Sequence, residues 1–570
     1  MSFAALFVIG MDMMQPTTPP KPGSGPIPAV KTCQVGFLPN ERKIAVITTG
    51  KEVTGEILRL PDRKQVLSAK GSAPRMDPDS GDNVSHLDFS HLQEPGQYVV
   101  SVPGLGESTP FEIGPNIFAK PFRMAIRSFT GQRSGIDVSL APDFPEYRFP
   151  AGQTELAKYH SSSGKTGTRD VRGGWYDAGD YGKYMVNSGI TTGTLLLAFE
   201  RNAAKLAGLK LDIPETGKSK LPDYLSEIKW NLDWMLKMQD EDGGAWHKAT
   251  TAQFSGFVMP AEDRADLLII GTGKAPYKNT TATANLAAVA AIASRVFRKY
   301  DPEYADRCLR AAKSAFEWCQ KFPRELYQQQ PEGIGTGGYG DGEPDDERLW
   351  AAVELYRATG EARYHDFFLE LVKKWPETFG EAPVPGWQDL RPLALLGYAS
   401  IQGQLVDPEF QKRLRQDLEK SADAVVQRIQ RNGYLMPLRS SDYIWGSNGV
   451  VANYAMVLQM ANSIIPKESY RQAALDCLHH LLGRNLWGTS YVTQVGTKWA
   501  KNPHHRPSGA DKLEEPWPGL LVGGPNADNG QKPPARQWFD LTESYRTNEN
   551  AINWNAPLVF ALAEYLGTTP

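Results

Sequence analysis

The sequence predicts a multidomain protein with an all-β sandwich over residues 29–114 followed by an all-α barrel over residues 115–570. The chain has 570 residues, which is more than one hydrophobic core normally serves. Short alternating segments rich in β-branched and aromatic residues fill the first part, whereas helical periodicity and long Gly/Pro-rich loops fill the second.

Residues 1–28 precede both parts. FAALFVIGM resembles a short signal h-region but lacks a positive n-region and a clear cleavage site of small residues. The following QPTTPPKPGSGP is too rich in Pro, Gly and Ser to pack. We expect residues 1–28 to be a disordered linker or tail, with or without a signal remnant.

Four segments carry the β prediction. They alternate apolar and polar residues, turns such as EPGQ and PDRK separate them, and they read KIAVITT, GEILRL, QYVVSVPG and PFEIG. Their length and spacing are typical of a sandwich of immunoglobulin type.

The rest of the chain shows helical periodicity in about a dozen paired segments. Leu286, Val289 and Val296, for example, share one helical face. Long loops inside a compact domain usually carry function. We therefore expect an α/α barrel whose loops form a cleft at one end.

Charge excludes several partners. Lys+Arg total 62 against 65 Asp+Glu, so a formal net charge of -3 offers no footprint for nucleic acid or an anionic membrane surface. No run of about 18 apolar residues predicts a membrane span. The 14 Trp residues weakly favour a carbohydrate ligand, because sugars stack on aromatic faces.

The cysteines predict neither a disulfide framework nor a cysteine zinc site. Only four are present, at positions 33, 308, 319 and 477, without metal-site spacing. Cys308 and Cys319 share a helical face and indicate buried thiols.

The segment GGWYDAGDYGKY places two carboxyl groups, Asp177 and Asp180, in a Gly-rich turn ahead of a helix. Two such close acids repel each other when both are ionised, which separates their pKa values and suits one of them to base catalysis. A helix N-cap with a solvated second aspartate explains the spacing equally well. The surrounding Trp and Tyr residues favour the catalytic interpretation.

Two further segments are candidates. Asn548 and Glu549 open the last helical segment, where a first-turn carboxylate is also expected on dipole grounds, and Glu543 competes for the same role. The segment NPHHRPS, residues 502–508, lacks a third zinc ligand, so sugar hydrogen bonding is the better interpretation. No GxSxG serine motif is present.

Six segments together resemble glycoside hydrolase family nine, the inverting cellulases. In the family's order they are GGWYDAGDYGKY, GGAWHKATT, WGSNGVVANYAMVL, LLGRNLWGTSYVTQVGTKWAKNPHHRPS, PWPGLLVGGPN and TNENAINWNAPLVFALAEYL. The resemblance implies an (α/α)6 barrel, and the β domain is similar to the immunoglobulin-like module that braces the barrel in one branch.

The resemblance implies a role for each acid. Asp180 matches the general base, Asp177 helps to hold the water nucleophile, and Glu549 matches the general acid. Inverting hydrolysis needs the base and acid roughly 6.5–9.5 Å apart, with water between them and the sugar. Burial would keep Glu549 protonated near neutral pH.

The resemblance also implies residues that contact the sugar. His504 and Arg506 match positions that grip the sugar near the cleavage point, and His247 and Trp554 match positions lining the cleft. Trp445 is expected as a stacking platform or as core.

Metal sites differ from the family pattern. Ser134, Gly152, Gln153 and Tyr176 replace the four ligands of a structural zinc found in relatives, so no zinc is expected. The loop GDGEPDDERLW implies calcium at Asp346 and Glu347, with Asp389 as a third ligand, and oxygen donors suit calcium. An acid-rich helix N-terminus explains the same residues. No cofactor is expected for the chemistry.

The expected function is endo-acting inverting hydrolysis of β-1,4-glucan, with a cello-oligosaccharide or polymer as partner. Aromatic-rich loops from Trp246 through Trp445 to Trp499 favour an open cleft. The alternatives are an exo-acting glucosidase, cellobiohydrolase or glucosaminidase of the same family, and a non-catalytic glucan-binding protein, against which the three acids argue. A terpenoid cyclase is disfavoured because DDxxD is absent. We expect a secreted or periplasmic monomer.

Overall fold

The computed structural model describes residues 26–403 and 405–567. Of the predicted N-terminal segment, residues 1–25 lie outside this part, so the expectations for a signal remnant and linker lie there too. Residues 26–28 have no regular secondary structure.

The first domain is a sandwich of two antiparallel sheets. Its strands are β1 (Val30–Lys31), β2 (Ile44–Thr48), β3 (Thr54–Arg59), β4 (Lys64–Lys70), β5 (Arg75–Met76), β6 (Asn83–Asp88), β7 (Gly96–Val102), β8 (Gly106–Glu107) and β9 (Phe111–Ile113). One sheet has the order β1-β2-β6-β5 and the other β4-β3-β7-β8, with β9 also paired to β7. β2 buries Ile44 to Ile47 in succession, so both of its faces are covered, whereas β9 buries the alternate residues Phe111 and Ile113.

The second domain is helical. Its helices are α1 (Ala119–Gly131), α2 (Met185–Leu206), α3 (Asp223–Lys237), α4 (Thr280–Val296), α5 (Pro302–Lys321), α6 (Asp345–Thr359), α7 (Ala362–Leu371), α8 (Arg391–Ala399), α9 (Pro408–Arg431), α10 (Ser447–Ile464), α11 (Glu468–Leu481), α12 (Arg506–Ala510), α13 (Tyr545–Asn548) and α14 (Ile552–Ala563).

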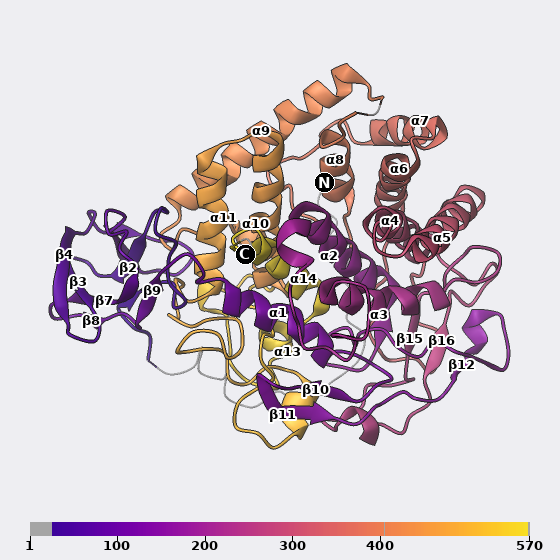
Figure 1. Ribbon diagram of the computed structural model, residues 1–570, viewed down its shortest axis with the longest axis horizontal. Coiled ribbons are helices and arrows are strands. Elements are labelled where there is room, and N and C mark those ends of the chain that lie inside the picture. Colours follow the sequence, from indigo (N-terminus) through magenta and orange to yellow (C-terminus); the bar gives the residue numbers. More distant parts are fainter. Residues whose placement is uncertain (1–25, 404, 568–570) are drawn as a thin grey trace.

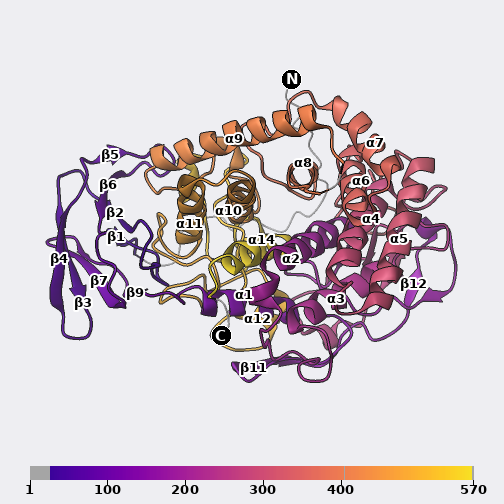
Figure 2. The same ribbon diagram turned by 45° about the horizontal axis from the view of Figure 1, so that its top comes forward.

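Six of these helices close a ring. Each packs on the next in the order α2, α4, α6, α8, α10, α14 and back to α2. An outer helix covers each one, in the pairs α2 with α3, α4 with α5, α6 with α7, α8 with α9, α10 with α11, and α14 with α1. The predicted (α/α)6 barrel is therefore confirmed, and Figure 2 shows α9 crossing the outside of α10 and α8.

Burial separates the two layers. Nearly every residue of α4 is buried, because small residues such as those of TATANLAAVAAIA let neighbouring helices approach on all sides. Outer α5 and α9 instead bury one stripe and leave charged residues exposed.

Short strands gather at one end of the barrel. They are β10 (Val138–Leu140), β11 (Phe144–Phe149), β12 (Ala157–Tyr159), β13 (Thr168–Arg169), β14 (Lys183–Tyr184), β15 (Lys248–Thr250) and β16 (Leu268–Ile270). β10 pairs with β11, and the rest form a sheet of order β13-β12-β16-β15-β14. These strands and α13 lie in the lower part of Figure 1.

The sandwich is joined firmly to the barrel. Arg42 forms an ion pair with Asp476 of α11 at 2.6 Å, and the Phe37 ring contacts His479 with centroids 4.9 Å apart. One buried hydrophobic cluster runs from the sandwich into the barrel. The sandwich therefore supports α11 from outside, at the left of the barrel in Figure 1.

All four cysteines are buried free thiols, as the sequence predicts for Cys308 and Cys319. Within residues 26–403 and 405–567, no helix has the length and apolar character to cross a membrane.

Candidate active site

The candidate acids meet where inner helices begin. Asp177 and Asp180 lie in the loop between β13 and β14, directly ahead of α2, and Glu549 lies between α13 and α14. Helices α2 and α14 are neighbours in the inner ring. The closed ring therefore brings together segments that are 369 residues apart, from position 180 to position 549.

The predicted motifs are bound to one another through their backbones. Ile552 N donates to Asp177 O at 2.9 Å, and Arg506 N donates to Gly179 O at 3.0 Å. A Cβ atom at Gly179 would lie 1.9 Å from His504 O, so only glycine allows the two loops this contact. The Gly of DAGD therefore serves the packing of NPHHRPS against the catalytic loop.

Asp177 is held on both carboxylate oxygens. Asn187 Nδ2 donates to Oδ1 at 2.6 Å and Tyr339 Oη donates to Oδ2 at 2.5 Å. Burial and then the charge of Asp180 raise the pKa of Asp177 to about 8, against the opposing effect of these hydrogen bonds. Asp177 thus holds a proton more tightly than an ordinary aspartate.

Cationic side chains compensate the charge of Asp180 more than that of Asp177. Gly182 N donates to its Oδ2 at 2.8 Å. Burial raises the pKa of Asp180, whereas the charges of Arg506 and Lys248 favour its ionised form. Asp180 is therefore the aspartate of this loop better suited to remain anionic.

Glu549 is placed to keep its proton. Its backbone pairs with His504 in a parallel bridge, and Gly523 N donates to Glu549 O at 2.7 Å. Burial, followed by the charges of Asp180 and Asp177, raises its pKa well above the usual range. The competing Glu543 is exposed instead.

We call Asp177, Asp180 and Glu549 the catalytic cluster. Three carboxyl groups whose charges act on one another cannot all ionise cheaply in a buried site. Arg506 favours the ionised form of both groups, but Lys248 acts in addition on Asp180, whereas the charges of Asp180 and Asp177 oppose ionisation of Glu549. A base and an acid with separated pKa values can activate water and protonate a leaving oxygen.

His504 presents one ring nitrogen to the site. Its Nδ1 lies 2.6 Å from Thr542 O, which can only accept, so Nδ1 carries the proton. Burial lowers the pKa of the imidazole, which keeps Nε2 an acceptor. The ring touches Phe257 edge-on at 5.2 Å and Tyr545 at 6.0 Å. A neutral acceptor between aromatic rings suits a sugar hydroxyl.

Arg506 links the catalytic loop to an aromatic pair. Its NH1 donates to Gly179 O at 2.9 Å and its Nε to Ser255 O at 2.9 Å. The guanidinium lies over Phe254 and Phe257, 5.5 and 5.7 Å from the ring centroids. Both rings are more than a third exposed.

Trp445 is an exposed platform rather than core. Its side chain is 44% exposed and contacts the ring of Tyr545 at 5.2 Å. Trp554 is partly exposed and lies behind it, because Cβ atoms at Gly446 or Gly449 would meet the Trp554 ring at 2.5 Å or less. Trp554 therefore supports the loop that carries Trp445.

Two expected cleft residues lie deeper. His247 is 0% exposed, with Nε2 2.7 Å from Gly338 O and its ring stacked on Tyr327 at 3.8 Å. Trp246 is also 0% exposed, so its expected place among the aromatic residues of an open cleft is wrong. His247 lies behind the cleft wall in this structure and supports it, which corrects the expectation that it lines the cleft.

The residues that replace the zinc ligands bond to one another and to the backbone. Ser134 Oγ donates to Gln153 Oε1 at 3.0 Å, and Gln153 Nε2 donates to Tyr181 O at 2.7 Å. A Cβ atom at Gly152 would lie 2.5 Å from Pro260 O, so the backbone leaves no room there for a ligating side chain. Neutral hydrogen bonds connect this loop to the catalytic loop.

The expected calcium residues are only partly arranged as a site. Among the described residues, no three His, Cys, Asp or Glu side chains are grouped so as to hold a metal ion. Asp389 pairs with Arg391 at 2.5 Å, and its charge also acts on Asp341 and Asp346. Asp346 Oδ1, Glu347 Oε2 and Asp341 Oδ2 are buried and have no hydrogen-bond partner among the described residues.

We call Asp341, Asp346 and Glu347 the α6 acidic cluster. Burial raises the pKa of each carboxyl group, and the charges of neighbouring acids add to this effect. Asp346 Oδ2 accepts from Leu390 N at 2.6 Å, so one oxygen of that residue is satisfied. All three side chains are buried, so this helix N-terminus is not a solvated acidic turn.

Sequence reasoning missed several residues that hold the acids. Tyr339 and Asn187 bind Asp177, and Lys248 acts on Asp180. Tyr339 lies in a Gly-rich loop with no helical or strand pattern, and only its place before the acidic segment could have drawn attention to it. Lys248 belongs to a recognised motif, but its burial could not be read from the sequence.

Comparison with known proteins gives two family models and several relatives that match most of the chain. The family model described as glycosyl hydrolase family 9 matches residues 118–562, and the cellulase N-terminal ig-like domain matches residues 26–107. The chain is similar to endoglucanase D of Acetivibrio thermocellus, with 36% identity over 94% of this chain and 83% of the relative.

Two matches from Bacteroides ovatus are similar in extent. The xyloglucan-specific endo-beta-1,4-glucanase BoGH9A is 35% identical over 96% of this chain and 95% of the relative. The solved structure described as Bacteroides ovatus GH9 has a TM-score of 0.86 and 34% identity, covering 94% of this chain and 98% of that one.

Proposed function

Because the chain belongs to glycosyl hydrolase family 9, whose members are inverting β-1,4-glucan hydrolases, we propose that Asp180 is its general base and Glu549 its general acid. The observation that carries this assignment is the unequal electrostatic environment of the two groups. Positive charges favour ionised Asp180, while burial and two neighbouring carboxyl groups favour protonated Glu549.

The proposed reaction is one displacement at the anomeric carbon. Asp180 takes a proton from water as the oxygen of that water forms a bond to the anomeric carbon. The glycosidic C–O bond breaks on the opposite face, and Glu549 gives its proton to the departing oxygen. Asp177, fixed on both oxygens, orients the water. The product is the α-anomer, and the two acids return to their starting states by exchanging protons with solvent.

We propose internal cleavage of cello-type glucan. The rings of Phe254, Phe257, Trp445 and Tyr545 are exposed. Trp445 contacts Tyr545, Arg506 lies over both Phe254 and Phe257, and Tyr545 and Phe257 each contact His504. Sugar rings stack on such faces, so this arrangement supports subsites beyond the cleavage point in more than one direction. The exo-acting enzyme remains the alternative within the family.

The product anomer and the cleavage pattern test this proposal. Proton NMR of fresh cellohexaose digests should show the α-anomer first, and carboxymethyl cellulose should lose viscosity before reducing ends accumulate. Initial β-anomer would overturn the inverting assignment. Release of one small product without viscosity loss would favour the exo-acting alternative, and parallel assays on xyloglucan would define the tolerance for branched chains.

Metal binding is proposed to be structural, since the family's chemistry requires no cofactor. The three unpartnered oxygens of the α6 acidic cluster support calcium, with backbone carbonyls and water completing the shell. The loss of all four ligand positions at Ser134, Gly152, Gln153 and Tyr176 supports a protein without zinc there. Elemental analysis of protein refolded with both metals should find calcium and no stoichiometric zinc.

We also propose that the protein acts as a monomer outside the cytoplasm. A polymeric glucan does not cross the cell membrane, so its hydrolase must meet it in a secreted or periplasmic location. Cell fractionation with an activity assay tests the location, and light scattering tests the oligomeric state. A dimer mass or activity confined to the cytoplasm would overturn the respective proposal.

A further inference from the structure

Lys248 is a buried cation without an acidic contact. Its side chain is 0% exposed, and no carboxylate among the described residues forms an ion pair with it. Instead Nζ donates to Gly337 O at 2.7 Å, Gln330 Oε1 at 2.9 Å and Thr336 Oγ1 at 3.1 Å. Burying an ammonium among neutral acceptors is costly, so a compensating role is expected.

The neighbouring residue holds the same segment. His247 Nε2 lies 2.7 Å from Gly338 O, which accepts its proton. Residues 247 and 248 therefore fix the consecutive peptides 336–338. The next residue, Tyr339, has a left-handed backbone (φ 48°) and donates to Asp177. Lys248, the first residue of β15, thus helps to fix the position of the Tyr339 hydroxyl group.

A second path leads from Lys248 to Asp180. Gly337 N donates to Tyr184 Oη at 3.0 Å, and Tyr184 pairs with Lys248 across β14 and β15. A Cβ atom at Gly182 would lie 2.6 Å from Tyr184 Oη and 2.7 Å from Asp180 Oδ2, so these two oxygens lie beside the same backbone position. Lys248 and Asp180 are therefore connected through one residue, because Tyr184 pairs with Lys248 and its hydroxyl lies beside the Asp180 carboxylate.

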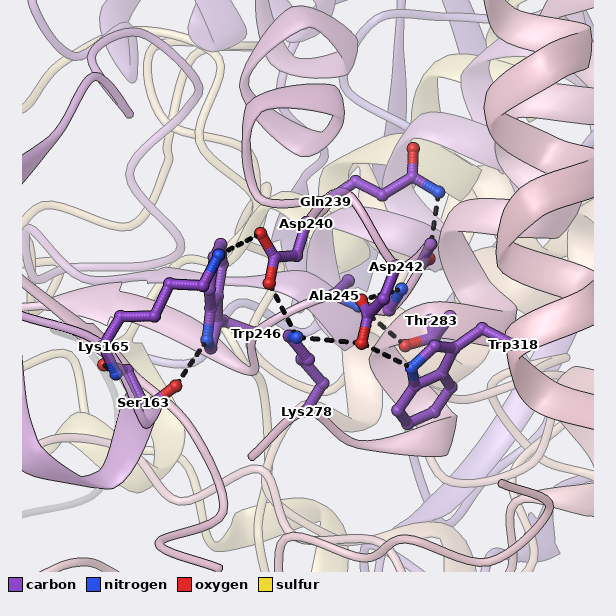
Figure 3. Close-up of polar contacts among 12 residues, drawn as sticks. Ser163, Lys165, Gln239, Asp240, Asp242, Ala245, Trp246, Lys278, Thr283 and Trp318 are labelled. Carbon is purple, nitrogen blue, oxygen red and sulfur yellow. Dashed lines mark hydrogen bonds and ion pairs between the residues drawn. The ribbon is translucent and has the colours of Figure 1, made fainter. Parts of the chain in front are cut away.

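Charged contacts fix the turn that precedes β15. Asp240 binds Lys165 at 2.5 Å and Lys278 at 2.7 Å, and Asp242 accepts from Trp318 Nε1 at 3.2 Å (Figure 3). Figure 3 also shows Trp246 Nε1 donating to Ser163 O, at 3.1 Å. The strand is therefore anchored immediately before residues 247 and 248.

We propose that Lys248 is a positioning residue for hydrolysis, which fixes the 336–339 segment and supplies, beside Arg506, a second positive charge that favours ionised Asp180. This inference rests on the proposed role of Asp180 as base. Burial lowers the pKa of Lys248 to about 7, and the charge of Asp180 opposes this effect, so the two groups stabilise each other's charged forms.

Several groups share this environment. The titratable and charged side chains near Asp180 are Asp177 of its own loop, Glu549 before α14, Arg506 of α12, Tyr184 of β14 and Lys248 of β15. Around Lys248 the rings of Tyr184 and Tyr327 lie 5.6 and 5.7 Å from Nζ, and His247 is adjacent in sequence.

Three substitutions separate charge from position. Lys248→Gln keeps a hydrogen-bond donor but loses the charge, Lys248→Arg keeps both, and Lys248→Met loses both. Loss of the charge should raise the pKa of Asp180 and move the acidic limb of kcat/KM upward by about one pH unit in the Gln and Met variants. The Met variant should also lose about tenfold in kcat through the displaced Tyr339, with less change in KM.

Lys183 is the matched control. It is also a buried lysine of this sheet, and its Nζ donates to Gly173 O at 2.9 Å, but Asp180 is not among the charges acting on it. Lys183→Met should lower stability without moving the acidic limb. An unmoved limb in Lys248→Gln, or an equal shift in Lys183→Met, would overturn the inference.

Two checks keep the outcome decisive. If Lys248→Met does not fold, the Gln and Arg variants both keep a hydrogen-bond donor and differ in charge, and equal acidic limbs would refute the charge role. Asp180→Asn must abolish turnover; if it does not, the proposed base is wrong. An inactive Asp180→Asn variant with unshifted Lys248 variants would refute the inference alone.

Discussion

The catalytic cluster and the α6 acidic cluster each bring together three carboxyl groups, but they differ in what surrounds them. Asn187 and Tyr339 donate to both oxygens of Asp177, Gly182 donates to one oxygen of Asp180, and Arg506 adds charge. In the α6 acidic cluster, each residue leaves one buried oxygen unpartnered. Burial alone therefore does not decide what a group of acids does. The neighbouring hydrogen-bond donors and cationic side chains decide whether its members take different protonation states or are suited to bind a metal ion.

The largest expected effect is removal of the base. Asp180→Ala should reduce hydrolysis by about 10⁴-fold or more, because the attacking water then lacks its proposed base. Azide should restore part of the activity and give an inverted glycosyl azide, detectable by NMR. Asp177→Ala should lose less activity. A greater loss in Asp177→Ala than in Asp180→Ala would mean that Asp177 is the base and Asp180 the residue that holds the water.

Removal of the acid should follow closely. Glu549→Gln should lower turnover of unactivated glucan by about 10²–10⁴-fold, because the leaving oxygen needs a proton. An aryl cellobioside with a good leaving group should lose less activity in the same assay. The exposed Glu543 provides the control, since Glu543→Gln should keep near-wild-type rates. Near-wild-type activity of Glu549→Gln on cellulose would reject the assignment.

The pH profile should show both roles of the catalytic cluster. Activity requires ionised Asp180, so kcat/KM should fall about tenfold per pH unit as pH drops below its raised pKa. Activity also requires protonated Glu549, so the rate should fall again as pH rises through the raised pKa of that group. The acidic limb should therefore lie above the usual aspartate range. An acidic limb near pH 4 in initial-rate assays would contradict this.

The α6 acidic cluster should respond to calcium rather than to substrate. Chelation should lower the melting temperature while activity at low temperature changes little, because a ligand that binds only the folded state stabilises it. Asp346→Asn should abolish this response and, without metal, raise the melting temperature by about 2–4 °C through relieved repulsion. Calorimetry with and without calcium checks both. A chelator that abolishes activity without a thermal shift would assign this cluster to catalysis.

The smallest effects are expected at the aromatic platforms. Trp445→Ala and Phe257→Ala should each raise KM for cellohexaose by about 3- to 10-fold with little change in kcat, because a stacking contact contributes about 1 kcal/mol. Cellotriose, which occupies fewer subsites, should distinguish the two pairs. The same substitutions should leave the calcium response unchanged. If chelation changed the melting temperature of these variants by a different amount than in wild type, the aromatic platforms and the α6 acidic cluster would be coupled.

Much of the fold follows from local pattern. The β-branched and aromatic residues of β2 and β7 and the small apolar residues of α4 can be recognised without knowing what these elements pack against. The six ordered motifs also led to the prediction of Asp180 as base and Glu549 as acid, through their resemblance to the family pattern. The order of the inner ring could not be read in this way, since helices that share a periodicity do not specify their neighbours.

The sequence by itself determined the residue types available, the sandwich followed by paired helices, and the loss of the zinc ligands. Only the tertiary structure decided that Trp246 and His247 are buried, that Asp389 pairs with Arg391 and that Asp341 joins Asp346. Burial and charge compensation depend on atoms from distant segments. Lys248 shows why: its chemistry is evident from the sequence, but its effect on Asp180 exists only because β15 pairs with β14 beside the catalytic loop.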